Sequence, residues 1–126
     1  MSVVIGGTTG VSPDGSSYKE DFLALSGTTP TVDCDLANVF SLVLSGNTAF
    51  TFSDAPASGT AFGFTLKIVQ DSGANGYTVT WPASVDWPAA TAPTLSSGAN
   101  EVDVFVFYTT DGGTTWYGFT AGQALG

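Results

Sequence analysis

Residues 62–68 read Phe62-Gly63-Phe64-Thr65-Leu66-Lys67-Ile68, and every second residue of this run is large and apolar. The intervening positions hold Gly, Thr and Lys. Because successive side chains of a strand point to opposite faces of a sheet, this alternation predicts a β-strand with one buried and one exposed face.

Short apolar runs separated by turn-forming residues flank this strand. Residues 77–81 follow a turn rich in Gly and Asn, which indicates a hairpin with residues 62–68. Residues 101–108 are apolar on both faces in their second half, as expected of a strand buried on both sides. Asp111-Gly112-Gly113 predicts a tight turn into residues 115–119 and so a final hairpin. We expect an all-β fold, specifically an antiparallel β-sandwich of jelly-roll or similar type.

The first 30 residues differ from the rest because Gly and Pro interrupt them repeatedly. We expect residues 1–30 to form an extended Gly-rich arm and residues 31–126 to form the sandwich domain. Residues 18–25 fit either two helical turns or a short strand. The apolar residues through which the arm is expected to attach are Val3, Val4, Ile5, Phe22 and Leu23.

Charge and composition limit the possible functions. The 126 residues include eleven Asp or Glu against Lys19 and Lys67, with no His, for a net charge of −9. Nucleic acids and anionic membranes are disfavoured as partners, because both are bound through Lys and Arg. The lack of His removes the commonest general base and metal ligand. Charged residues make up 10% of the chain, against about 25% in average domains, which suits contact with neighbouring proteins.

The residues that could support chemistry have simpler structural interpretations. Asp33 with Asp35, and Glu101 with Asp103, have the spacing of paired carboxylates on one strand face, and a solvated face is the simpler explanation. Cys34 is expected to be buried and inert, since the neighbouring carboxylates would raise the pKa of its thiol. We expect no catalytic residue, no metal and no cofactor.

Polar turn residues are also candidates for a calcium site. Residues 71–76 offer several oxygen ligands but lack the closing Glu of an EF-hand loop. Asp71 and Asn75 are more simply turn formers, and the same holds for Asp111.

Large aromatic residues are the remaining candidates for a site. They can complete the core, form a subunit interface or stack on a ligand such as a sugar, and the sequence leaves all three roles open. The residues concerned are Trp81, Trp87, Trp116 and Tyr117.

An ordered series of turn and Trp-Pro signals extends over about residues 32–122. It comprises Gly76-Tyr77-Thr78-Val79-Thr80-Trp81-Pro82-Ala83-Ser84-Val85, then Trp87-Pro88, Ala92-Pro93-Thr94-Leu95-Ser96, and Phe107-Tyr108-Thr109-Thr110-Asp111-Gly112-Gly113-Thr114-Thr115-Trp116-Tyr117-Gly118. This series resembles a module found at the ends of tail-fibre proteins, and in small virion structural proteins, of tailed bacteriophages. The resemblance implies a β-sandwich, often trimeric, that is attached to a phage particle.

From this resemblance we expect a non-enzymatic virion structural protein, made in the host cytoplasm and located in the virion. The expected role is a capsid decoration or head-fibre subunit. It would form a homotrimer and attach by its N-terminal arm to the major capsid protein or another virion protein. The alternative is a receptor- or carbohydrate-binding module of a tail fibre or tail tip, with a host-surface glycan as ligand.

Overall fold

The structure is a computed structural model that describes residues 19–126, so the predicted arm residues Val3, Val4 and Ile5 lie outside the described residues. The described part contains ten strands and one short 3-10 helix: β1 (Phe22–Ala24), β2 (Thr31–Asp33), β3 (Val39–Val43), β4 (Thr48–Ala49), β5 (Thr51–Ser53), β6 (Phe62–Val69), β7 (Val79–Thr80), β8 (Val85–Asp86), η1 (Pro88–Ala90), β9 (Val102–Thr109) and β10 (Trp116–Leu125). None of the described residues form a helix of the length and apolarity needed to cross a bilayer.

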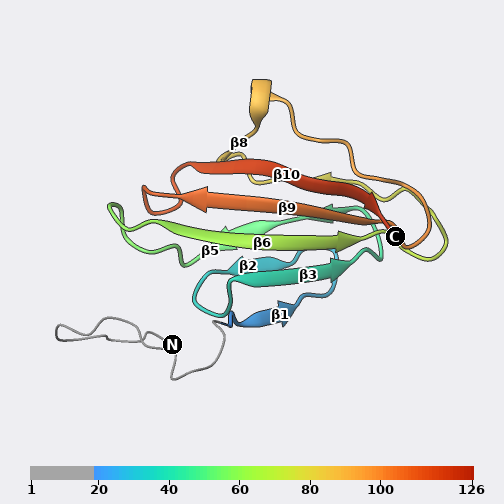
Figure 1. Cartoon of the computed structure of the whole chain (residues 1–126), viewed down its shortest axis with the longest axis horizontal. Coiled ribbons are helices and arrows are strands. Elements are labelled where there is room, and N and C mark those ends of the chain that lie inside the picture. The colour runs from blue at the N-terminus through green and yellow to red at the C-terminus, as the bar shows by residue number, and fades with distance from the viewer. Residues whose placement is uncertain (1–18) are drawn as a thin grey trace.

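Six strands form the main sheet in the order β1-β3-β6-β9-β10-β8 (Figure 1). The central pairs β6–β9 and β9–β10 are antiparallel, whereas β1–β3, β3–β6 and β8–β10 are parallel. Two small sheets, β2–β5 and β4–β7, are also parallel. They adjoin, because only Phe50 separates β4 from β5.

The all-β class is confirmed, but the predicted antiparallel arrangement is wrong because the sheets are mixed. After β3 the chain crosses to the small sheets as β4 and β5, and it then returns to the main sheet as β6. The excursions through β2 and through β4 and β5 each bring the chain back in the same direction, so β1–β3 and β3–β6 are parallel pairs. Here strands, rather than a helix, make the crossover.

The predicted hairpin between residues 62–68 and 77–81 is also wrong. β6 pairs with β3 and β9, while β7 pairs with β4 in a small sheet. The buried side chain of Gln70 explains the change of direction. Its amide nitrogen donates to the Tyr77 and Ser96 carbonyls at 3.2 and 3.1 Å, and its oxygen accepts from the Tyr77 N–H at 3.2 Å.

The predicted final hairpin is confirmed as β9–β10. Its turn requires glycine, since Gly112 and Gly113 have φ values of 71° and 82°. The Thr109 hydroxyl donates to the Asp111 carboxylate at 2.9 Å, and that carboxylate accepts from the Thr115 N–H at 2.9 Å.

The hydrophobic core lies between the main sheet and the small sheets. Phe52 of β5 lies with its ring centroid 5.0 to 5.5 Å from those of Phe64, Phe107 and Trp116, which belong to the main sheet. Apart from Phe62, which is partly buried, the inward side chains of β3, β6 and β9 are almost completely buried. The small sheets therefore cover one face of the main sheet and leave its other face without a second layer of described residues.

The main sheet begins inside the segment that was predicted to be an arm. Residues 22–24 form the strand β1 and pair with β3, so of the two structures that the sequence allowed there, the strand is adopted. Leu23 packs against the core, while Phe22 is 58% exposed.

Candidate functional site

Of the three tryptophans predicted as site candidates, two lie in the core and the third, Trp81, packs against it. Trp116 and Trp87 are only 2% and 9% exposed, and Trp81 stacks on Phe50 with ring centroids 5.5 Å apart. The fourth candidate, Tyr117, is 41% exposed and faces the opposite side of the sheet from Trp116. Tyr117 therefore lies apart from the tryptophans, on the uncovered side of the main sheet.

Strand register arranges the side chains of this uncovered side, here called the outer face, into four rows. The first row is Asp86, Tyr117, Tyr108 and Gly63; the second is Phe119, Val106, Thr65, Val39 and Phe22; the third is Gly122, Val104, Lys67, Ser41 and Ala24; the fourth is Leu125, Val102, Val69 and Val43.

Large apolar side chains dominate the outer face. Six of them are 41 to 62% exposed, namely Phe22, Val43, Tyr108, Tyr117, Phe119 and Leu125. The Tyr108 ring centroid lies 5.2 Å from that of Tyr117 and 6.1 Å from that of Phe119, and the rings of Tyr108 and Phe119 are parallel. These three rings form a continuous aromatic surface at one end of the face.

The outer face has few charges although the chain is strongly acidic. Among the four rows, Asp86 in the first and Lys67 in the third are the ionisable residues besides the tyrosines. The other carboxylates of the described part lie before β1, in turns and loops, at the end of β2 or on the inner side of β9. Electrostatic repulsion between acidic chains is therefore weakest at this face.

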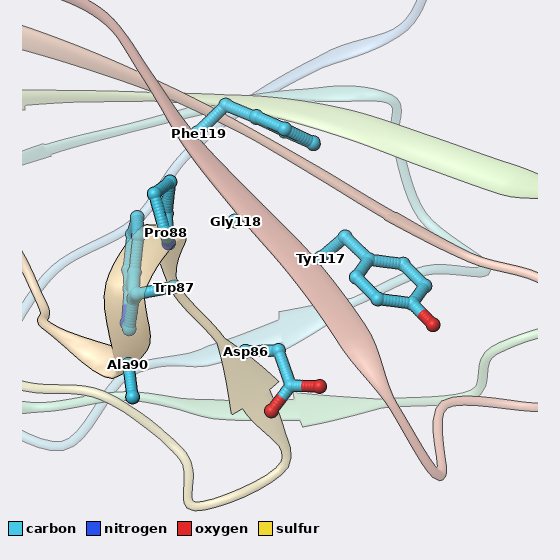
Figure 2. Close-up of a pocket in the computed structure, with 7 residues that line it drawn as sticks. All are labelled: Asp86, Trp87, Pro88, Ala90, Tyr117, Gly118 and Phe119. Carbon is cyan, nitrogen blue, oxygen red and sulfur yellow. The ribbon is translucent and has the colours of Figure 1, made fainter.

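A groove of about 480 Å³, here called the edge groove, lies beside β10 at the β8 edge of the outer face. Figure 2 shows the residues that line it: Asp86, Trp87, Pro88, Ala90, Tyr117, Gly118 and Phe119. The Asp86 carboxylate extends to the same side of the sheet as the Tyr117 ring. The groove thus combines one carboxylate with several apolar walls.

Close packing and strained backbone shape the edge groove. A Cβ atom on Gly118 would lie 2.9 Å from Trp87 Cζ3 and 2.9 Å from Val85 Cγ1, so glycine lets the indole approach β10. Ala89 and Ala90 in η1 have φ values of 55° and 54°, a region that L-residues other than Asn and Asp seldom adopt. Such strain is tolerated where the surrounding contacts impose it.

Three carboxylates converge elsewhere, at the turn after β2. The ligand oxygens of Asp33, Asp35 and Asp54 all lie within 4.8 Å of one another. These are the residues of the described part with the geometry to hold a cation, and oxygen ligands suit Ca²⁺ or Mg²⁺. The neighbouring Cys34 is buried, and burial together with the charges of Asp33, Asp54 and Asp35 raises the pKa of its thiol to about 12. The predicted burial of Cys34 is confirmed.

Asp103 and Asp71, two of the candidate catalytic and calcium-binding carboxylates, accept hydrogen bonds from backbone N–H groups. Burial raises the pKa of Asp103, but hydrogen bonds from Ser96, Ala124 and Gln123 outweigh it, so that the pKa lies below its usual value. Asp71 accepts hydrogen bonds from the backbone N–H groups of Gly73 and Asn75, as expected of a turn former.

The sequence interpretation missed Tyr108, Phe119 and Asp86 as surface candidates. A signal for the aromatic pair was present, because alternation along β9 and β10 opposes Tyr108 to the buried Phe107 and places Phe119 on the same face as Tyr117. The position of Asp86 had no such signal, since β8 has only two residues and its pairing with β10 is parallel.

No protein-family model matches the chain, and no curated protein or solved structure is significantly similar to it.

Proposed function

We propose that the chain is a non-enzymatic structural subunit that self-associates, and that it serves as a capsid decoration or head-fibre protein of a virion. The observation that carries the proposal is the outer face, a four-row apolar surface that no described segment covers. Exposed apolar patches of this extent mark interaction sites in soluble proteins.

The size of the outer face supports association between copies. Each half-exposed aromatic side chain leaves about 100 Å² open, and with the partly exposed valines the face offers on the order of 800 Å². That is about the share that one partner contributes to a stable interface of standard size. Aromatic residues at its centre and few charges are also the composition of interface cores.

Charge supports the same partner. A chain of net charge −9 repels copies of itself unless the contacting surfaces carry no net negative charge. The outer face meets this condition, because its rows hold Asp86 and Lys67, whose charges offset each other. The preferred occupant of the outer face is therefore a second copy of this chain, and the homotrimer expected from the phage resemblance is the proposed assembly.

The core supports a scaffold role and a β-sandwich description of the fold. The small sheets pack on the main sheet through Phe50, Phe52 and Val32, and the rings of Trp81, Trp87 and Trp116 fill the space between the layers. An aromatic core of this kind holds the outer face rigid. We further propose that residues 1–18, which precede the main sheet, attach the chain to the virion.

Sedimentation equilibrium of the purified chain tests self-association. The wild type should form a defined oligomer, and Tyr108→Glu should dissociate it by placing a charge in the aromatic surface. Leu36→Glu is the matched control, because Leu36 is 58% exposed but lies in the turn after β2, away from the outer face. A wild type that stays monomeric at the highest soluble concentration would refute the proposal.

Attachment needs a separate test, in which residues 1–18 are deleted so that β1 stays intact. The truncated chain should keep the number of copies in its oligomer and should no longer co-sediment with the virus particle of which the wild-type chain is a part. Retained co-sedimentation would exclude the tethering role.

A glycan-binding module is the second candidate, favoured by the rings of Tyr108, Tyr117 and Phe119 beside the Asp86 carboxylate. Aromatic rings stack on sugars and a carboxylate accepts hydrogen bonds from their hydroxyls. Isothermal titration with oligosaccharides separates the two functions. Saturable binding by a monomeric wild type, abolished by Tyr108→Glu, would favour the glycan-binding module.

A further inference from the structure

Among the described residues, Lys67 has no opposite charge beside it on its own sheet face. Its cross-strand neighbours on the outer face are Ser41 and Val104, and the next outer-face positions along β6 are Thr65 and Val69. All four are uncharged. If a second layer covers the outer face, the ammonium group loses water and needs an opposite charge, because an unpaired buried charge is strongly destabilising.

Asp86 is the carboxylate of the outer face, but Lys67 cannot reach it within one chain. β8 and β6 are separated by β10 and β9, so the two residues are three strand spacings, or about 14 Å, apart across the sheet. They also lie two rows apart, which adds about 13 Å along the strands. A separation of about 19 Å exceeds the combined reach of the two side chains.

The edge groove offers a suitable environment for a lysine from another molecule. The Asp86 carboxylate would meet the ammonium group, and Trp87, Pro88 and Phe119 would contact the four-carbon stem. The Tyr117 ring adds a π face, which attracts a cation.

We infer that Lys67 of one copy inserts into the edge groove of a second copy and pairs there with Asp86, so that this ion pair sets the register in which outer faces associate. The inference rests on the proposed self-association and adds its geometry. Two closed arrangements, a two-fold dimer and a three-fold ring, pair every Lys67 with an Asp86. In both, each copy inserts its Lys67 into a neighbour's edge groove and accepts one Lys67 in its own.

Charge reversal tests the pair. Lys67→Glu and Asp86→Lys should each raise the dissociation constant of the oligomer at least about tenfold, and the double variant should restore it to near the wild-type value. Lys19→Glu and Glu20→Lys are matched controls, because each makes the same change of charge at an exposed site outside the outer face rows. Circular dichroism melting curves check that every variant is folded.

Zero-length carbodiimide cross-linking gives a second readout, and with only two lysines in the chain the products are simple to assign. The wild-type oligomer should yield an amide between Lys67 and Asp86 of different copies, identified by mass spectrometry of mixed ¹⁴N- and ¹⁵N-labelled chains. Asp86→Asn should remove this product, and Asp35→Asn should leave it.

The outcomes distinguish the two proposals. A monomeric wild type refutes self-association itself. The ion pair is overturned, while self-association stands, in either of two cases. In the first, Lys67→Glu and Asp86→Lys raise the dissociation constant no more than the controls do. In the second, the double variant does not recover the wild-type dissociation constant.

Discussion

Asp103→Asn should lower the free energy of unfolding by about 2 kcal/mol at neutral pH. The Asp103 side chain is 2% exposed and accepts hydrogen bonds from the N–H groups of Ser96 at 2.8 Å and Ala124 at 3.0 Å, and from the Gln123 amide at 3.3 Å. Asparagine keeps one acceptor oxygen but replaces the other with a donor. At least one buried N–H then faces a donor, and the lost hydrogen bond to a charged group costs about 1.5 to 3 kcal/mol.

The pH dependence of this loss follows from the lowered pKa of Asp103 in the folded state. A carboxyl group whose pKa is lower when folded stabilises the native state fully above its unfolded pKa. That stabilisation disappears as the pH falls through the usual value of 3.8 towards the lower pKa of the folded chain. The difference between wild type and Asp103→Asn should therefore shrink as the pH is lowered below 4.

Urea unfolding followed by tryptophan fluorescence measures both effects, since all three indoles lie in or against the core. Glu20→Gln is the control, because Glu20 is exposed and the substitution should change stability by less than about 0.5 kcal/mol. The reasoning is refuted if Asp103→Asn is as stable as this control at pH 7, or if its deficit is the same at pH 3.5 as at pH 7.

Three further substitutions or modifications test other parts of the structure. Gly118→Ala should lower the free energy of unfolding in urea by about 1 to 3 kcal/mol, because the new Cβ would meet the Trp87 ring. Gly122→Ala should lower it less, because its Cβ meets only the flexible Leu125 side chain. Equal losses of unfolding free energy would contradict this packing. Asp54→Asn should raise the melting temperature slightly, since Asp54 has a φ of 60°, which asparagine adopts readily, and lies in a group of three carboxylates; a gain that does not shrink with added salt would count against the electrostatic part. Cys34 should react with a thiol reagent at pH 8 only after unfolding, because burial and nearby carboxylates raise its pKa to about 12; stoichiometric labelling of the folded chain would disprove that environment.

Local alternation made several strands predictable. The pattern of residues 62–68 identified β6, and the Asp111-Gly112-Gly113 turn identified the β9–β10 hairpin, because strand faces and tight turns depend on neighbouring residues. Strand partners and directions depend on residues distant in sequence. For β1, pairing with β3 selects a strand where the local sequence also permitted a helix.

In the candidate site, too, some features depend on neighbouring residues and others on residues distant in sequence. Trp116 and Tyr117 are adjacent in a strand, so they must face opposite sides, and the sequence alone allowed this conclusion. Which side faces the core depends on the small sheets that cover Trp116, and their parallel pairing had no sequence signal. Asp86 lies in the site only because β8 pairs with β10.

β9 provides the strongest link between sequence and proposed assembly. Its inward residues Phe105 and Phe107 are fully buried, while its outward residues Val102, Val104 and Val106 stay partly exposed. A strand covered on one face normally alternates apolar and polar residues, as the neighbouring strand β6 does, whereas a strand that is apolar on both faces is typical of burial on both. The sequence thus predicts that residues 101–108 are buried on both sides, whereas within one chain only the inward side is covered. A second copy on the outer face would supply the missing layer, and Lys67, which lies opposite Val104, would then be the charge that such a layer must neutralise.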